Sequence, residues 1–179
     1  MGFTVAMGII TFFAEKFSRF RKPKPVSGSV YDFTLNGLNG RAVPFDQFRG
    51  KNLLIVNTAS RCGYTPQYAD LEKLHEQYGD KVVVLGFPAN NFMWQEPGAN
   101  ADIAEFCEIN YGVKFQMFEK ISVKGKDQHP LYQWLWAKSG HQPSWNFCKY
   151  LIDRSGEVAD FYPSKVNPLD PKIIRKITS

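Results

Sequence analysis

Residues 53–87 read LLIVNTASRCGYTPQYADLEKLHEQYGDKVVVLGF, and this stretch decides the fold of the chain. The apolar runs at 53–56 and 81–87 are short and partly β-branched, which predicts two buried strands. Between them, apolar residues recur at helical spacing from Tyr68 to Tyr78, and Pro66 is of a type favoured in the first turn of a helix. A strand, a helix and a second strand of these lengths predict a βαβ unit with two parallel strands.

The rest of the chain extends this unit into one α/β domain, which we assign to residues 27–179. A chain of 179 residues with 44% hydrophobic content can bury the core of one such domain. In chain order we expect a β-hairpin over 31–45, the βαβ unit, a helix that starts at Asn100, a segment with a short strand over 115–123, a helix over 131–136, strands over 147–153 and 158–162, and an amphipathic helix over 171–177. This is the order of the thioredoxin fold, here with an N-terminal β-hairpin and a central mixed sheet flanked by helices.

Cys62 lies between the first strand of the unit and the helix. Unpaired N–H groups and the positive end of a helix dipole favour a thiolate at such a place, and Arg61 adds a nearby cation. The position therefore indicates a reactive cysteine, and the alternative is a buried, inert one. Thioredoxins carry Cys-x-x-Cys here, but Thr65 holds the second position. Dithiol exchange within one motif is excluded.

The charge of the chain argues against a nucleic-acid-binding protein. Residues 1–25 carry five basic residues and one acidic residue, which is +4 of the formal +5, so the rest is nearly neutral. Three cysteines, Cys62, Cys107 and Cys148, are too few for a disulfide framework and fit a reducing compartment, which predicts a cytoplasmic protein. No spacing of cysteine and histidine matches a metal site, and we expect neither a metal nor another cofactor.

Residues 1–26 form a leader with an apolar stretch at 3–14 followed by basic residues. The apolar stretch is too short to span a bilayer, which takes about 20 residues. Its charges come after the apolar part, unlike those of a secretory signal, and Ala6 stands where myristoylation requires Ser or Thr. Two hypotheses stay open: contact with a membrane surface through residues 3–24, or a disordered tail.

Three blocks of the sequence resemble the signatures of the glutathione peroxidases. They are NTASRCGYT at 57–65, GFPANNFMWQEPG at 86–98 and WNF at 145–147, in the order typical of the family. The resemblance runs from about Val30 to the end of the chain. It implies an antioxidant enzyme that reduces hydrogen peroxide and organic hydroperoxides with a thiol donor.

The resemblance also implies a site with a peroxidatic cysteine or selenocysteine at position 62, completed by Gln95, Trp145 and Asn146. Thiolate attack on an O–O bond requires groups that orient the peroxide and stabilise charge as it moves from sulfur to oxygen. Amide and indole N–H groups donate hydrogen bonds without titrating. Taken alone, Gln95 is better explained by a solvated loop and Trp145 by core packing. Trp145 and Asn146 are adjacent, so on a regular strand their side chains would point to opposite faces. Both can line one site only where the strand begins irregularly, and Pro143-Ser144 favours such a start.

Cys107 resembles the resolving cysteine of the thioredoxin-dependent branch of the family. A sulfenic acid on Cys62 condenses readily with a second thiol, so the resemblance implies a Cys62–Cys107 disulfide that thioredoxin, rather than glutathione, reduces. A disulfide needs Cα atoms within about 7 Å, so cysteines on separate helices require local unwinding before they can pair. We expect Cys148 to be structural.

Two departures from the family pattern leave this site intact. Ala89 stands where many relatives have a third cysteine, and Asn91 where they commonly have Gln. The segment 137–144 is also short and lacks the loop by which tetrameric relatives associate. This implies a monomer with an open site that could accept lipid hydroperoxides.

Two other functions stay open at this point. In a peroxide-sensing relay, the Cys62–Cys107 disulfide would pass to a partner protein, and the sequence supports this equally because both cycles share their first two steps. A non-catalytic interaction domain of the thioredoxin fold would require Cys62 to be inert.

Overall fold

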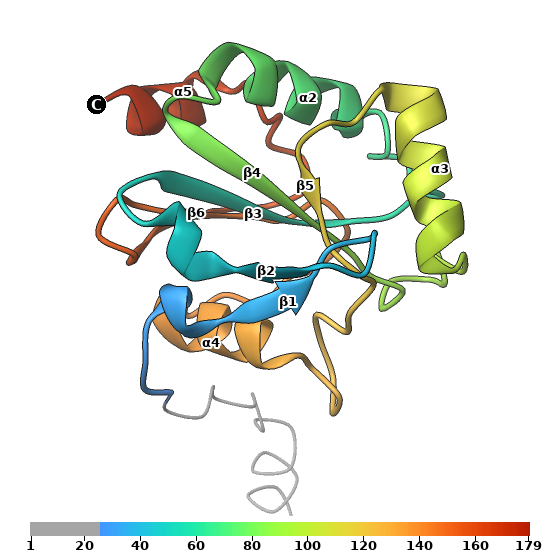
Figure 1. Ribbon diagram of the computed structural model, residues 1–179, viewed down its shortest axis with the longest axis horizontal. Helices are drawn as coiled ribbons and strands as arrows, with labels where there is room; N and C mark the ends of the chain where they lie inside the picture. The colour runs from blue at the N-terminus through green and yellow to red at the C-terminus, as the bar shows by residue number, and fades with distance from the viewer. Residues whose placement is uncertain (1–25) are drawn as a thin grey trace, which may run out of the picture.

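The computed structural model describes residues 26–179, which form a sheet with helices on both faces and a separate two-stranded hairpin (Figure 1). The sheet has the strand order β5-β4-β3-β6-β7. The elements are η1 (Val30–Asp32), β1 (Thr34–Asn36), β2 (Ala42–Pro44), η2 (Phe45–Phe48), β3 (Asn52–Thr58), α2 (Gln67–Tyr78), β4 (Val82–Pro88), α3 (Asn100–Tyr111), β5 (Gln116–Met117), α4 (Pro130–Ser139), β6 (Lys149–Ile152), β7 (Val158–Tyr162) and α5 (Pro171–Thr178).

The predicted βαβ unit is β3-α2-β4. Strands β3 and β4 are parallel and in register from Asn52 opposite Val82 to Thr58 opposite Pro88. Strand β6 runs antiparallel to β3, with Lys149 opposite Val56. The carboxyl ends of β3 and β4 and the amino end of β6 therefore meet at one edge of the sheet. The three signature blocks of the sequence converge there.

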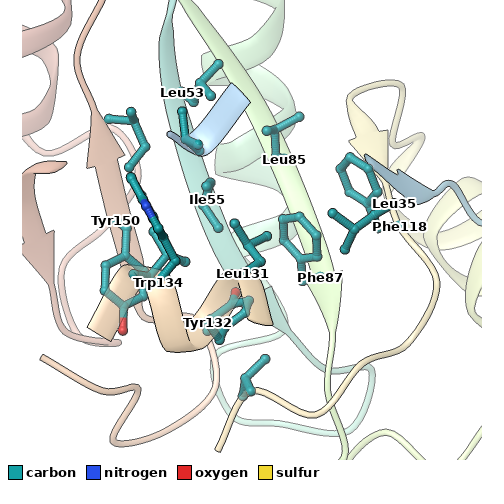
Figure 2. Close-up of a cluster of buried hydrophobic side chains, with 14 of the residues drawn as sticks. Leu35, Leu53, Ile55, Leu85, Phe87, Phe118, Leu131, Tyr132, Trp134 and Tyr150 are labelled. Carbon is teal, nitrogen blue, oxygen red and sulfur yellow. The ribbon is translucent and has the colours of Figure 1, made fainter. Parts of the chain in front are cut away.

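Alternation along β3 divides the core between the two faces of the sheet. Leu54 and Val56 belong to a buried cluster with residues of α2, α3 and α5. Leu53 and Ile55 point to the opposite face, where they join Leu85 and Phe87 of β4 and the buried side of α4, seen in Figure 2. Both faces of the strands are thus buried, and this explains the continuous apolar run at 53–56.

The predicted thioredoxin fold is confirmed: a mixed central sheet with flanking helices follows an N-terminal β-hairpin. Several predicted boundaries are wrong. The helix expected over 131–136 runs on to Ser139, where Gly140, with a left-handed φ of 75°, ends it. The first arm of the hairpin begins at Thr34, because Val30–Asp32 form a 3-10 turn capped by Ser29. The strand predicted over 147–153 begins at Lys149, because Phe147 has a φ of 63°, in the left-handed region where no strand can continue.

The leader hypotheses concern residues that lie almost entirely outside the described part of the chain, and they stay predictions. Within residues 26–179, none of the helices is long and apolar enough to cross a bilayer.

Candidate active site

Cys62 lies in a series of turns that link β3 to α2, and Thr65 closes them. The Cys62 N–H donates to Thr65 Oγ1 at 2.9 Å, and the same hydroxyl donates to the Ala59 carbonyl at 2.8 Å. The Thr65 N–H donates to the Cys62 carbonyl at 3.0 Å. Thr65 thus stands where thioredoxins carry the second cysteine, and its hydrogen bonds hold the turn around Cys62.

The Cys62 thiol has a hydrogen-bond donor from its own turn. Its Sγ accepts the Tyr64 N–H at 3.4 Å, within the range of a bond to sulfur. Cys62 itself is 8% exposed and belongs to the same buried cluster as the first turns of α2. A backbone donor at this distance stabilises negative charge on the sulfur.

Gln95 reaches this turn on the loop between β4 and α3. Its carbonyl accepts the N–H of Arg61, the neighbour of Cys62, at 3.0 Å. Its side-chain Oε1 accepts Nδ2 of Asn146 at 2.8 Å. Asn146 is completely buried, and its Oδ1 has no hydrogen-bond partner within residues 26–179. Two of the predicted site residues are therefore in direct contact, and Gln95 is bonded to the backbone beside Cys62.

Trp145 and Asn146 lie in a turn before β6, as the sequence predicted for two adjacent residues of one site. Asn57 holds this turn: its Nδ2 donates to the Trp145 carbonyl at 2.9 Å, and its own carbonyl accepts the Phe147 N–H at 2.6 Å. The Trp145 ring is half-buried, lies 5.7 Å from the Phe92 ring, and packs against the cluster that contains Cys62.

Cys107 lies within α3, is 3% exposed, and belongs to the same buried cluster as Cys62. Burial raises the pKa of the Cys107 thiol to about 11, and the neighbouring Tyr68 hydroxyl opposes this rise. One side of Cys107 lines a groove of about 740 Å³ between α3 and the β4–β5 edge. Cys62, Cys107 and Cys148 are all free thiols.

Three residues near the site were assigned no role from the sequence. Asn57 is a polar residue at the end of an apolar strand, a signal that could have revealed it. Glu96, next to Gln95, is 1% exposed and accepts the Ser60 hydroxyl at 3.1 Å; burial raises the pKa of its carboxyl. Tyr68 is fully buried beside Cys107. No signal in the sequence indicated this contact, because it depends on the packing of α2 against α3.

The described residues bring together no group of three or more His, Cys, Asp or Glu side chains that could hold a metal ion.

Comparison with known proteins decides the family. The family model described as glutathione peroxidase matches residues 30–136. The chain belongs to the glutathione peroxidase family. A glutathione peroxidase of Lactococcus lactis is 48% identical over 145 residues, which cover 78% of this chain and 92% of the relative. The hydroperoxy fatty acid reductase gpx1 of Synechocystis is 45% identical over 79% of this chain and 90% of its own length.

A yeast relative from Saccharomyces cerevisiae, the glutathione peroxidase-like peroxiredoxin HYR1, is 47% identical over 72% of this chain and 83% of its own length. Among solved structures, that of Trgpx in its apo form is 36% identical with a TM-score of 0.67, over 86% of this chain and 98% of the other. T. cruzi GPX1 is 30% identical with a TM-score of 0.63, over 83% and 93%. This member of the family is accordingly a thiol-dependent peroxidase.

Proposed function

We propose that Cys62 is the peroxidatic residue and that Gln95, Trp145 and Asn146 assist it. The Cys62 thiolate attacks one oxygen of the hydroperoxide, the O–O bond breaks, and the other oxygen leaves as an alcohol or water after it takes a proton. The sulfur is oxidised by two electrons to a sulfenic acid, and the hydroperoxide is reduced by the same two electrons.

The observation that carries this proposal is the convergence of the three blocks at one edge of the sheet. The Tyr64 N–H donates to Cys62 Sγ and supports a thiolate. The Gln95 carbonyl accepts the N–H of Arg61 beside Cys62, and the Gln95–Asn146 hydrogen bond holds the two amides together. Because these amides are fixed before the substrate arrives, they can stabilise the leaving oxygen without reorganisation.

Cys107 is proposed as the resolving thiol. Its sulfur attacks the sulfenic sulfur of Cys62, the S–O bond breaks, and the oxygen leaves as water with the proton of Cys107. In the reduced structure Cys107 is buried inside a helix with a thiol pKa of about 11, so resolution requires the end of α3 to open. The helix ends shortly afterwards at Gly112, which has a left-handed φ of 59°, and a local opening at a helix end is less costly than one in its middle.

Thioredoxin is the proposed reductant, since a protein dithiol returns two electrons to the Cys62–Cys107 disulfide in one exchange. Relatives at 47% and 44% identity are named glutathione peroxidase-like peroxiredoxins, which supports a protein dithiol over glutathione. We also propose that the enzyme is cytoplasmic, because it has few cysteines, and monomeric, because its 137–144 segment is short.

Steady-state turnover of hydrogen peroxide with thioredoxin, and separately with glutathione, tests the assignment. Cys62→Ser should abolish turnover with both donors, and Cys107→Ser should abolish it with thioredoxin. Cys148→Ser is the matched control, because Cys148 is also buried and its sulfur has the Ser144 and Ser164 hydroxyls as hydrogen-bond partners, at 3.8 and 3.5 Å; it should keep the parent rate. Efficient glutathione turnover by Cys107→Ser would refute the resolving role. Stable mixed disulfides with one target protein and negligible turnover would favour the relay.

A further inference from the structure

Lys149 is the first residue of β6, is fully buried, and takes no part in the reaction steps proposed above. Its Nζ donates to the Phe147 carbonyl at 2.8 Å and to Gln67 Oε1 at 2.7 Å. A third bond, at 2.7 Å, goes to the carbonyl of Val166, in the segment after β7. Among residues 26–179 no carboxylate forms an ion pair with this lysine. A lysine is almost never fully buried without such a partner, so its placement requires another explanation.

The bond to Phe147 holds the turn that carries Trp145 and Asn146. Phe147 has a φ of 63°, in the left-handed region that is unfavourable for a residue with a side chain. Its N–H donates to the Asn57 carbonyl at 2.6 Å, and its own carbonyl accepts the Lys149 amine. Both polar backbone groups of this strained residue are thus held, one from β3 and one from β6. Loss of either bond would let the turn relax toward an ordinary φ and displace the side chain of Asn146.

The bond to Gln67 connects the same lysine to the thiol. Gln67 is the first residue of α2, and its N–H donates to the Tyr64 carbonyl at 2.9 Å. The Tyr64 N–H in turn donates to Cys62 Sγ at 3.4 Å. A continuous series of hydrogen-bonded residues therefore links the Cys62 sulfur through Lys149 to the neighbour of Asn146.

We propose that Lys149 is a positioning residue for the peroxidase reaction, because it fixes the turn of Trp145 and Asn146 relative to the turn of Cys62. Fixed donors stabilise the charge on a leaving oxygen only when they lie at the correct distance from it. A displacement of about 1 Å can slow a reaction by about 100-fold. A lysine suits this role, since its amine donates to acceptors on separate segments from the end of one long side chain.

This inference rests on the proposed role of Cys62, and stopped-flow oxidation by hydrogen peroxide at pH 8 tests both. In Lys149→Met the rate constant for oxidation of Cys62 should fall by about tenfold, while the rate of disulfide formation stays that of the parent. Lys165→Met, which changes an exposed lysine, is the matched control and should keep both rates. If Cys62 of the parent does not react, the proposed function fails. If it reacts and Lys149→Met matches it, only the positioning role fails.

A variant at the other end of the link checks that Lys149 acts through α2. Gln67→Leu has a side chain of similar size but lacks the oxygen that accepts the Lys149 amine. It should slow oxidation of Cys62 to a similar extent. Because both changes break one link, the double variant should be no slower than the slower single variant. Oxidation by Gln67→Leu at the parent rate, or a double variant slowed by the product of the two single effects, would overturn the link.

Alkylation of Cys62 by iodoacetamide separates positioning from a general loss of structure. Alkylation uses the same thiolate, but iodide leaves without hydrogen bonds from amide or indole donors. Lys149→Met should therefore be alkylated at the parent rate. Equal slowing of alkylation and oxidation would refute the positioning role, since it would place the effect on the thiolate itself.

Amide hydrogen exchange reports on the turn without any reaction at Cys62. The N–H of Phe147 should exchange faster in Lys149→Met than in the parent, because the turn opens more often when its carbonyl is released. Exchange at the parent rate would overturn the inference, since it would show that the bond to Asn57 holds the turn alone.

Discussion

Lys149 is a fully buried lysine at the start of β6, and its side chain joins α2, the turn that carries Trp145 and Asn146, and the segment between β7 and α5. Its Nζ donates to Gln67 Oε1 at 2.7 Å, to the Phe147 carbonyl at 2.8 Å and to the Val166 carbonyl at 2.7 Å. All three acceptors are neutral. Because burial removes the hydration of the ammonium, the pKa of Lys149 falls to about 7.

The lowered pKa makes the stability of the fold depend on pH in a defined direction. In the unfolded chain the pKa of a lysine is about 10.4. Between these two values the unfolded state binds more protons than the folded state, so the free energy of unfolding rises with pH. Each pH unit in this window is worth about 1.4 kcal/mol. The parent therefore gains roughly 2 kcal/mol between pH 8 and pH 9.5 from Lys149.

Lys149→Met removes both this titration and the three hydrogen bonds. At pH 9.5 Lys149 is neutral in the fold and its amine has two N–H donors, so at about 1 kcal/mol for each bond the variant should be about 2 kcal/mol less stable than the parent. At pH 8 the deficit should shrink to about zero, because folding of the parent there costs the release of the proton that Lys149 holds in the unfolded chain.

Urea unfolding under reducing conditions at pH 8, 8.5, 9 and 9.5 measures this difference. Lys165→Met is the matched control: Lys165 is exposed, and its curve should follow that of the parent at every pH. A deficit in Lys149→Met that stays constant from pH 8 to pH 9.5 would refute the reasoning, since it would mean that the three acceptors keep the ammonium protonated throughout.

Three further predictions concern the site itself. Asn146→Ala should slow the oxidation of Cys62 by hydrogen peroxide by about 10- to 100-fold, because a fixed hydrogen-bond donor is lost. Stopped-flow kinetics would measure this step, and the rate of disulfide formation should not change. If disulfide formation were slowed instead, Asn146 would act in resolution. Thr65→Val should destabilise the fold by about 1–3 kcal/mol, because it removes the hydroxyl that bonds both Ala59 and Cys62; urea unfolding that matches the parent would show that the turn is held by other contacts. If α3 opens before Cys107 reacts, the rate of disulfide formation should level off above about pH 9, as for an exposed thiol; a rise that continues toward pH 11 would mean that Cys107 reacts from its buried position.

Local sequence patterns predicted the fold well where the residues of one helix or strand are enough to specify it. The apolar runs of β3 and β4 and the helical spacing of α2 specify a βαβ unit without reference to the rest of the chain. Prediction was wrong at the start of β6, because the conformation of Phe147 depends on the hydrogen bond from its N–H to the carbonyl of Asn57, 90 positions earlier. A long-range contact of this kind leaves no periodic signal in the sequence.

The sequence by itself indicated the residues proposed for the reaction: three blocks and one helix point to Cys62, Gln95, Trp145, Asn146 and Cys107. Only the tertiary structure decided how they meet. Parallel β3 and β4 and antiparallel β6 bring three distant loops to one edge of the sheet, and the Gln95–Asn146 bond spans 51 positions. The burial of Lys149 was likewise decided by packing, because the solvent exposure of a side chain depends on which distant elements cover it.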